Sequence, residues 1–91
     1  MRDQEKRDLI AEVAPEAILF DNPDFDGSII GITSIGAVVY DLGRMVEELA
    51  RDDNIDLEAA MEFIDYNTLR SLSYCQEGQA PVIVDRSWFE E

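Results

Sequence analysis

The sequence predicts an α+β fold, a small antiparallel sheet packed against two helices in the order α-β-β-β-α-α-β. Short runs of β-branched and aromatic residues alternate with turn residues in the first half of the chain. Apolar residues then recur at helical spacing, and one more apolar run follows near the end. At 91 residues the chain is long enough for a single domain, which we expect to cover residues 1–91.

The first apolar residues of the chain recur at helical spacing. Leu9, Ile10 and Val13 follow a charged first turn, and Pro15 ends the pattern. We therefore expect a short or frayed helix within residues 1–15.

Three short apolar runs then predict a three-stranded antiparallel meander. They cover residues 17–20 (AILF), 28–33 (SIIGIT) and 37–40 (AVVY). Turn residues separate them, with Asn-Pro at 22–23 and Ser-Ile-Gly at 34–36.

Two helices follow, each marked by an N-cap residue. Asp41 precedes an apolar stripe, and Asp56 precedes a second one; Asn54 can end the first helix in a left-handed conformation. We expect the second helix to break near 66–67, where Asn67 can cap a further turn and Tyr66 can lie on the sheet. The apolar stripes are Leu42, Met45, Val46 and Leu49 in the first helix, and Leu57, Ala60, Met61, Ile64 and Thr68 in the second.

A closing apolar run at 81–84 (PVIV) predicts a fourth strand, and Pro81 at its start indicates a sheet edge. Residues 86–91 are expected to form a C-terminal tail. Leu49, Ile64 and Val39 are expected in the core.

The stretch DNPDFDG at 21–27 partly fits a calcium-binding loop. Counted from Asn22, the loop places Asp24, Asp26 and Gly27 where a calcium loop has oxygen ligands and its glycine. The twelfth place holds Thr33 instead of a bidentate Glu, and the flanks read as strands. A hairpin turn is the favoured interpretation, with Asp24 and Asp26 a weak calcium candidate and no other metal or cofactor expected.

The chain has 21 acidic and 7 basic residues, a net charge of −14 and no histidine. This balance disfavours direct nucleic-acid binding, which depends on Lys and Arg. It either serves solubility alone or forms an acidic face that fits a basic groove on a protein partner. The helix acids expected to form that face are Glu47, Glu48, Asp52, Asp53, Glu58 and Glu62.

Catalysis is not expected, because proton transfer near neutral pH would fall to carboxylates with strongly raised pKa values. Cys75 has no histidine to activate it and no second cysteine to pair with, so a structural thiol is expected. No uncharged run is long enough to span a membrane, so we expect a cytoplasmic protein.

Three stretches carry a resemblance: FDNPDFDGSIIGITSIGAVVYDLGRMVEEL, MEFIDYNTLRSLSY and APVIVD. Together they resemble small acidic hypothetical proteins of phages and integrated mobile elements in gut bacteria. The resemblance covers residues 17–85 and implies a genomic setting, without a mechanism.

Two functions follow as hypotheses. The first is a non-enzymatic acidic protein that binds a basic host protein and inhibits a nucleic-acid-binding defence factor, much as a DNA mimic would. The second is a structural or regulatory homo-oligomer, such as a homodimer, that uses the 81–84 strand together with Trp88 and Phe89 as its contact. An alternative contact patch for a partner comprises Tyr66, Asn67, Arg70, Trp88 and Phe89.

Overall fold

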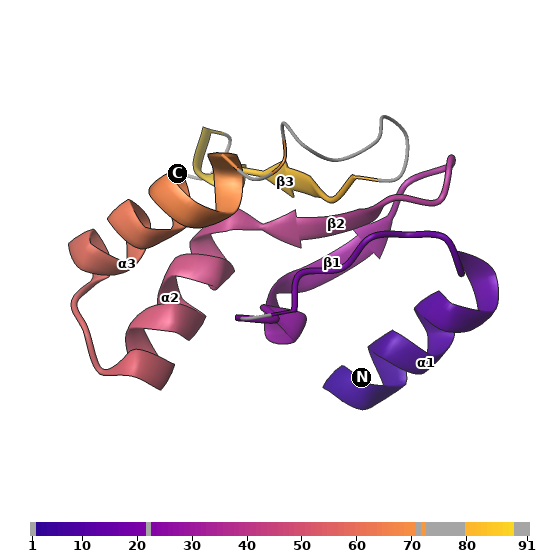
Figure 1. Ribbon diagram of the computed structural model, residues 1–91, viewed down its shortest axis with the longest axis horizontal. Helices are drawn as coiled ribbons and strands as arrows, with labels where there is room; N and C mark the ends of the chain where they lie inside the picture. The colour runs from indigo at the N-terminus through magenta and orange to yellow at the C-terminus, as the bar shows by residue number, and fades with distance from the viewer. Residues whose placement is uncertain (1, 22, 71, 73–79, 89–91) are drawn as a thin grey trace.

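A computed structural model describes the chain except residues 1, 22, 71, 73–79 and 89–91. Helices α2 and α3 lie side by side at one end of the sheet, and α1 lies at the other end (Figure 1). Over the described residues the order is α-β-β-α-α-β. The elements are α1 (Asp3–Val13), β1 (Ile29–Ile32), β2 (Val38–Asp41), α2 (Leu42–Asp53), α3 (Leu57–Phe63) and β3 (Val82–Val84), with short turns η1 (Asp26–Ser28), η2 (Ile64–Leu69) and η4 (Arg86–Trp88).

The sheet has three strands in the order β1-β2-β3 and is mixed, so the prediction of four antiparallel strands is wrong. β1 and β2 form the expected antiparallel hairpin, in which Ile29 lies opposite Tyr40. β3 runs parallel to β2, with Ile83 opposite Tyr40. Parallel neighbouring strands need a long crossover connection, and the segment through α2 and α3 supplies it. β3 lies at the sheet edge, as Pro81 indicated.

The segment predicted as the first strand, 17–20, is extended but is not part of the sheet. The backbone N–H of Phe20 donates to the hydroxyl of Tyr40 at 3.1 Å, and the carbonyl of Phe20 accepts from Nη2 of Arg7 at 3.1 Å. Side chains thus satisfy the backbone groups that a neighbouring strand would otherwise pair. Leu19 and Phe20 pack against the core, so their apolar character serves burial and not strand pairing.

The core forms where α2, α3 and the loop before β1 meet the sheet. Leu49 and Ile64 are buried as expected, together with Tyr40 and Met45. Val39 is only partly buried, because it alternates with the fully buried Val38 and Tyr40 and so faces the other side of β2. The prediction for Val39 is therefore wrong.

The predicted N-caps of both helices and the predicted end of the first helix are confirmed. The carboxylate of Asp41 accepts a hydrogen bond from the N–H of Gly43 at 3.1 Å, and that of Asp56 accepts from Ala59 at 2.7 Å. Asn54 ends α2 with φ of 54°, in the left-handed region. The predicted apolar stripe is confirmed at Ala60, Ile64 and Thr68, which are buried, but Leu57 in the first turn of α3 is 58% exposed.

The second helix does not break at Tyr66 and Asn67. It continues as the π-helical turn η2, a wider turn than the α-helix before it. The side-chain amide of Asn67 donates to the carbonyl of Phe63 at 3.2 Å and does not cap a new turn. Within the described part of the chain, none of the helices has the length and apolar character that crossing a membrane requires.

Candidate functional site

The 21–26 loop is organised by an unusual residue. Phe25 adopts φ of 54°, in the left-handed region, although it is not a glycine. Its ring is 1% exposed and meets the ring of Phe20 edge to face, with centroids 6.0 Å apart. Because burial of the ring holds this backbone conformation, Asp24 remains exposed while Asp26 is buried. Asp24 and Asp26, which are two positions apart, therefore differ in environment: Asp24 faces solvent, and Asp26 lies inside the protein.

The hairpin-turn interpretation of this loop is wrong, since no strand precedes it, but its acidic residues do have structural partners. The carboxylate of Asp24 accepts from the N–H of Asp26 at 3.0 Å. Oδ2 of Asp26 lies 2.5 Å from Nε of Arg7. Over the described residues there is no group of three or more metal-binding side chains. Asp24 and Asp26 thus each have a partner within the protein.

Across from this loop, the last two turns of α2 complete a hollow of about 220 Å³, which we call the acidic hollow. The loop contributes Asp21 and Asp24, and α2 contributes three more carboxylates. No Lys or Arg is among its described lining residues. The full lining is Asp21, Pro23, Asp24, Phe25, Glu48, Leu49, Asp52 and Asp53.

Glu48 is the half-buried member of the acidic hollow. Burial raises the pKa of its carboxyl, the nearby Asp24 and Asp52 raise it further, and a hydrogen bond from the Ser28 hydroxyl at 3.0 Å acts in the opposite direction. A Cβ at Gly27 would lie 2.8 Å from Oε1 of Glu48, so only glycine allows this approach without a shift. The raised pKa thus reports mainly the removal of this carboxyl from water, to which the negative charges of Asp24 and Asp52 add.

The cations of α2 lie on a neighbouring surface. Arg44 and Arg51 line a second hollow together with Gly27, Glu47 and Glu48, so Glu48 lies between the two hollows. Nε of Arg51 lies 3.4 Å from Asp52, in an exposed pair that adds little stability. Glu47 is thus flanked by arginines and does not line the acidic hollow.

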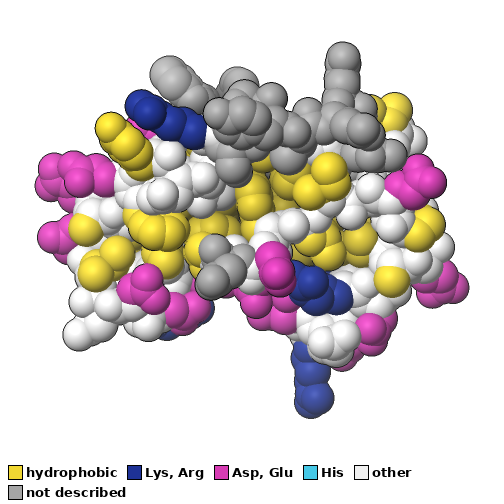
Figure 2. Space-filling model, in the orientation of Figure 1, with side chains coloured by type: hydrophobic (Ala, Val, Ile, Leu, Met, Phe, Trp, Pro, Cys, Tyr) yellow, Lys and Arg dark blue, Asp and Glu magenta, His cyan; other side chains and the backbone are white. Residues whose placement is uncertain are grey.

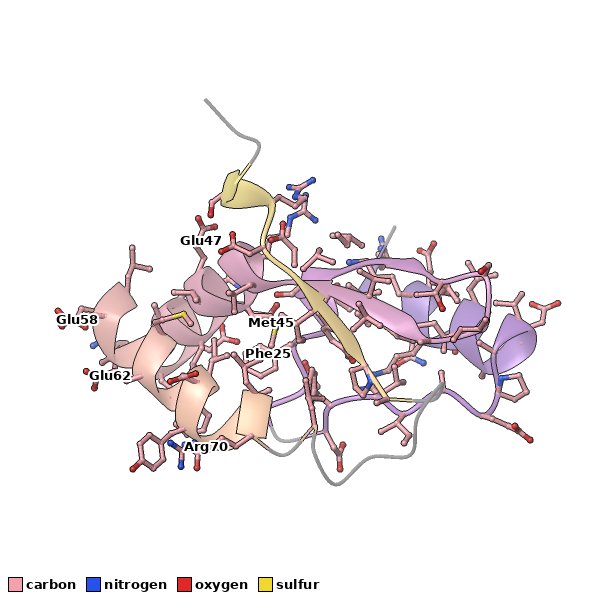
Figure 3. The ribbon with its side chains drawn as sticks, turned by 90° about the horizontal axis from the view of Figure 1, so that it is seen from above. Phe25, Met45, Glu47, Glu58, Glu62 and Arg70 are labelled. Atoms are coloured by element: carbon pink, nitrogen blue, oxygen red, sulfur yellow. The ribbon has the colours of Figure 1, made fainter. Side chains whose placement is uncertain are left out.

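The six predicted acidic residues therefore fall into three groups. Glu48, Asp52 and Asp53 line the acidic hollow, whereas Glu47 lines only the second hollow, which it shares with Glu48. Glu58 and Glu62 project from the outer side of α3, away from Glu47 (Figure 3). On the face drawn in Figure 2, acidic side chains lie to the left and right of a central apolar area and below it. Asp21 and Asp24 were not predicted as part of the acidic face, because only tertiary folding brings them to α2.

The alternative patch is partly assembled on η2. The guanidinium carbon of Arg70 lies 4.2 Å from the ring centroid of Tyr66, and Tyr66 is 66% exposed. The tyrosine thus faces solvent and does not lie on the sheet as predicted. Asn67 is exposed on the same turn. Trp88 ends η4, but its side chain, like Phe89 and Cys75, lies outside the described residues.

The start of the predicted C-terminal tail is anchored. Residues 86–88 form η4, and Nε of Arg86 lies 3.1 Å from Oδ2 of Asp41, the residue that caps α2. Arg44 lies 3.7 Å from the same oxygen. Asp41 is buried, and its charge is stabilised by both arginines and by the first turn of α2. This cluster fixes the end of β3 to the start of α2.

Comparison of the chain with family models, with curated proteins and with solved structures finds no match. Inference about function therefore starts from the chemistry of the acidic hollow and from the patch on η2.

Proposed function

We propose that this protein is a non-enzymatic binding protein that captures a basic protein partner through the acidic hollow. The partner we favour is a nucleic-acid-binding host factor, which the protein inhibits by occupying the groove that otherwise holds the polyanion. The observation that carries this proposal is the convergence of five carboxylates, from two segments distant in sequence, on one hollow whose described lining has no cation.

Electrostatics support a basic partner. Carboxylates held close together raise one another's energy, and an arginine or lysine from a partner relieves that repulsion. Burial is the main cause of the raised pKa of Glu48, and the charges of Asp24 and Asp52 add to it, so a cation from a partner would be favoured beside this carboxyl. The net charge of −14 extends the attraction beyond the hollow and speeds encounter with a basic surface.

A basic groove that binds DNA or RNA offers the complementary chemistry, because its Lys and Arg side chains are spaced for negative groups. A folded body with clustered carboxylates competes for those side chains directly. The resemblance to proteins of phages and mobile elements favours a host defence factor as the owner of that groove.

The test is a pulldown from host lysate with mass spectrometry, followed by binding measurements on the purified partner. We expect a basic partner, competition by nucleic acid, and capture that weakens as salt rises from about 0.05 to 0.5 M, since the Debye length falls from roughly 14 to 4 Å.

Matched charge-reversal variants locate the contact. Asp52→Lys with Asp53→Lys alters the acidic hollow at the C-terminus of α2, where added cations suit the helix dipole and leave the fold intact. Glu5→Lys with Glu12→Lys makes the same change in net charge on exposed positions of α1. We expect the first pair to abolish capture and the second to weaken it only slightly. Glu58→Lys with Glu62→Lys reports whether α3 extends the contact.

If the α1 pair and the hollow pair weakened capture equally, net charge alone would explain the binding. The acidic hollow would then be rejected as the site. A partner retained in high salt would move the contact to the Tyr66 and Arg70 patch.

A second candidate function, the homo-oligomer, is favoured by the edge position of β3 and by Val82, which is 37% exposed. Recovery of the protein alone, with a dimer mass in solution, would support it.

A further inference from the structure

Helix α1 is attached to the rest of the protein mainly through polar contacts. Only Ile10 of its apolar residues is buried, whereas Leu9 is 42% and Val13 is 58% exposed. The helix has 11 residues and no side-chain N-cap. A helix of this length is marginal by itself in water, so its persistence depends on docking.

Two consecutive cations make that docking. Nζ of Lys6 donates to the carbonyls of Asp26 and Ile29, each at 3.2 Å. Arg7 donates from Nε to the carboxylate of Asp26 and from Nη2 to the carbonyl of Phe20. One turn of α1 therefore holds the 21–26 loop, the start of β1 and the chain before the loop.

The Arg7–Asp26 ion pair is only half satisfied. Oδ2 of Asp26 accepts from Arg7, but Oδ1 is buried without a hydrogen-bond partner within the described residues. A buried carboxylate oxygen without a partner is costly, and that cost ends when the carboxylate meets water. The closed state of α1 thus contains a penalty that opening relieves.

A hollow also lies beside the contact between α1 and β1. It has a volume of about 240 Å³ and is lined by Lys6, Leu9 and Ile10 of α1 and by all four residues of β1. The core around Tyr40, Met45 and Ile64 packs between the sheet and the other two helices, and among the described residues the α1 region joins it only through Ile10 and Ala14.

We propose that α1 is a latch that opens as a unit while the rest of the fold stays intact, and that the ion pair between Arg7 and Asp26 is its clasp. Opening exposes Ile10 and the apolar edge of β1 and hydrates Asp26. Local opening of this kind has a lower free energy than global unfolding and engages few other contacts.

Native-state hydrogen exchange of the full chain in increasing, sub-denaturing urea tests the latch. We expect the free energy of opening at the α1 amides to depend weakly on urea, because this opening exposes little surface. The free energy of opening at the α2 amides should depend strongly on urea. If α1 and α2 share one opening free energy and one urea dependence, α1 is part of the global unit and the proposal is overturned.

A matched pair of variants tests the clasp. Arg7→Gln should raise α1 exchange at least about tenfold, the effect expected from losing a charge-assisted hydrogen bond, and leave α2 exchange unchanged. Arg2→Gln removes the same charge from an exposed position just before α1 and should change neither. Equal acceleration by both variants, or of both helices by Arg7→Gln, would reject the ion pair as the clasp. The urea experiment on the unaltered chain decides the matter if Arg7→Gln does not fold.

Discussion

The hydroxyl of Ser28 donates a hydrogen bond to Oε1 of Glu48 at 3.0 Å, and this contact joins the turn before β1 to the middle of α2. Ser28 is fully buried and Glu48 is half-buried. The contact holds the Glu48 carboxylate, which lines the acidic hollow, in place before any partner arrives. Preorganisation of this kind lowers the entropic cost of binding.

Glu48→Gln should stabilise the protein at pH 7, because the amide still accepts from Ser28 and removes a charge that burial and Asp24 disfavour. The pKa of Glu48 is raised above its ordinary 4.5 in the folded state. Between these two values the folded state binds more protons, so its free energy of unfolding falls as pH rises through that window.

The advantage of Glu48→Gln should therefore be full at pH 7 and shrink as pH falls towards 4.5, the ordinary pKa. Urea unfolding of both proteins from pH 4 to pH 7 measures it. Glu47→Gln removes an equal charge from an exposed position of the same helix, and should change stability by under about 0.5 kcal/mol. A Glu48→Gln protein less stable than the unaltered chain at pH 7 would contradict this account of the hollow.

Ile64→Ala should destabilise the fold by about 2 to 5 kcal/mol, since it empties a fully buried site between η2 and the core. Leu57→Ala, at a position 58% exposed on α3, should have a far smaller effect. Chemical denaturation gives both values. Comparable losses at the two positions would mean that the α3 face is assigned wrongly.

Two glycines give a matched test of the backbone. Gly36 has φ of +88°, so Gly36→Ala should cost about 1 to 2 kcal/mol. Gly31 lies in β1 with nothing within 4 Å of an added Cβ, so Gly31→Ala should be neutral or stabilising by up to about 1 kcal/mol. Thermal unfolding of both variants checks the sign. A loss of stability in Gly31→Ala equal to that in Gly36→Ala would mean that other atoms fill the space beside Gly31 in β1.

Calcium at about 1 mM, the weak end of extracellular sites, should leave the melting temperature unchanged. Asp26 already pairs with Arg7, and Asp24 accepts from the N–H of Asp26. A saturable rise in melting temperature that disappears in Asp24→Asn would establish a calcium site, because that variant keeps the acceptor oxygen and removes the charge.

The helices of the second half were predictable because their signals are local. Asp41 and Asp56 accept from N–H groups two and three residues ahead, and Asn54 needs only its own backbone conformation. The sheet was harder. An apolar run looks the same in sequence whether it pairs as a strand, as β3 does, or packs on the core without pairing, as 17–20 does. In the second case side chains bond the backbone groups of Phe20.

The acidic hollow could be predicted only in part. Periodicity placed Glu48, Asp52 and Asp53 on α2, but nothing local says that Asp21 and Asp24 meet them. That meeting depends on the left-handed conformation of Phe25, which propensity assigns to glycine or asparagine. Similarly, the ion pair between Arg86 and Asp41 joins positions far apart in sequence and leaves no trace in a short window.

The parallel pairing of β3 with β2 has a consequence for the order of folding. Val39 lies opposite Val82, so this contact must close a loop that contains both α2 and α3. Long loops close slowly, whereas the β1–β2 hairpin and the two helices form from near neighbours, and we therefore expect β3 to join the sheet last. Until it does, β2 is a bare edge that a second chain can pair with, and strong mutual repulsion between chains of charge −14 keeps such half-folded molecules apart.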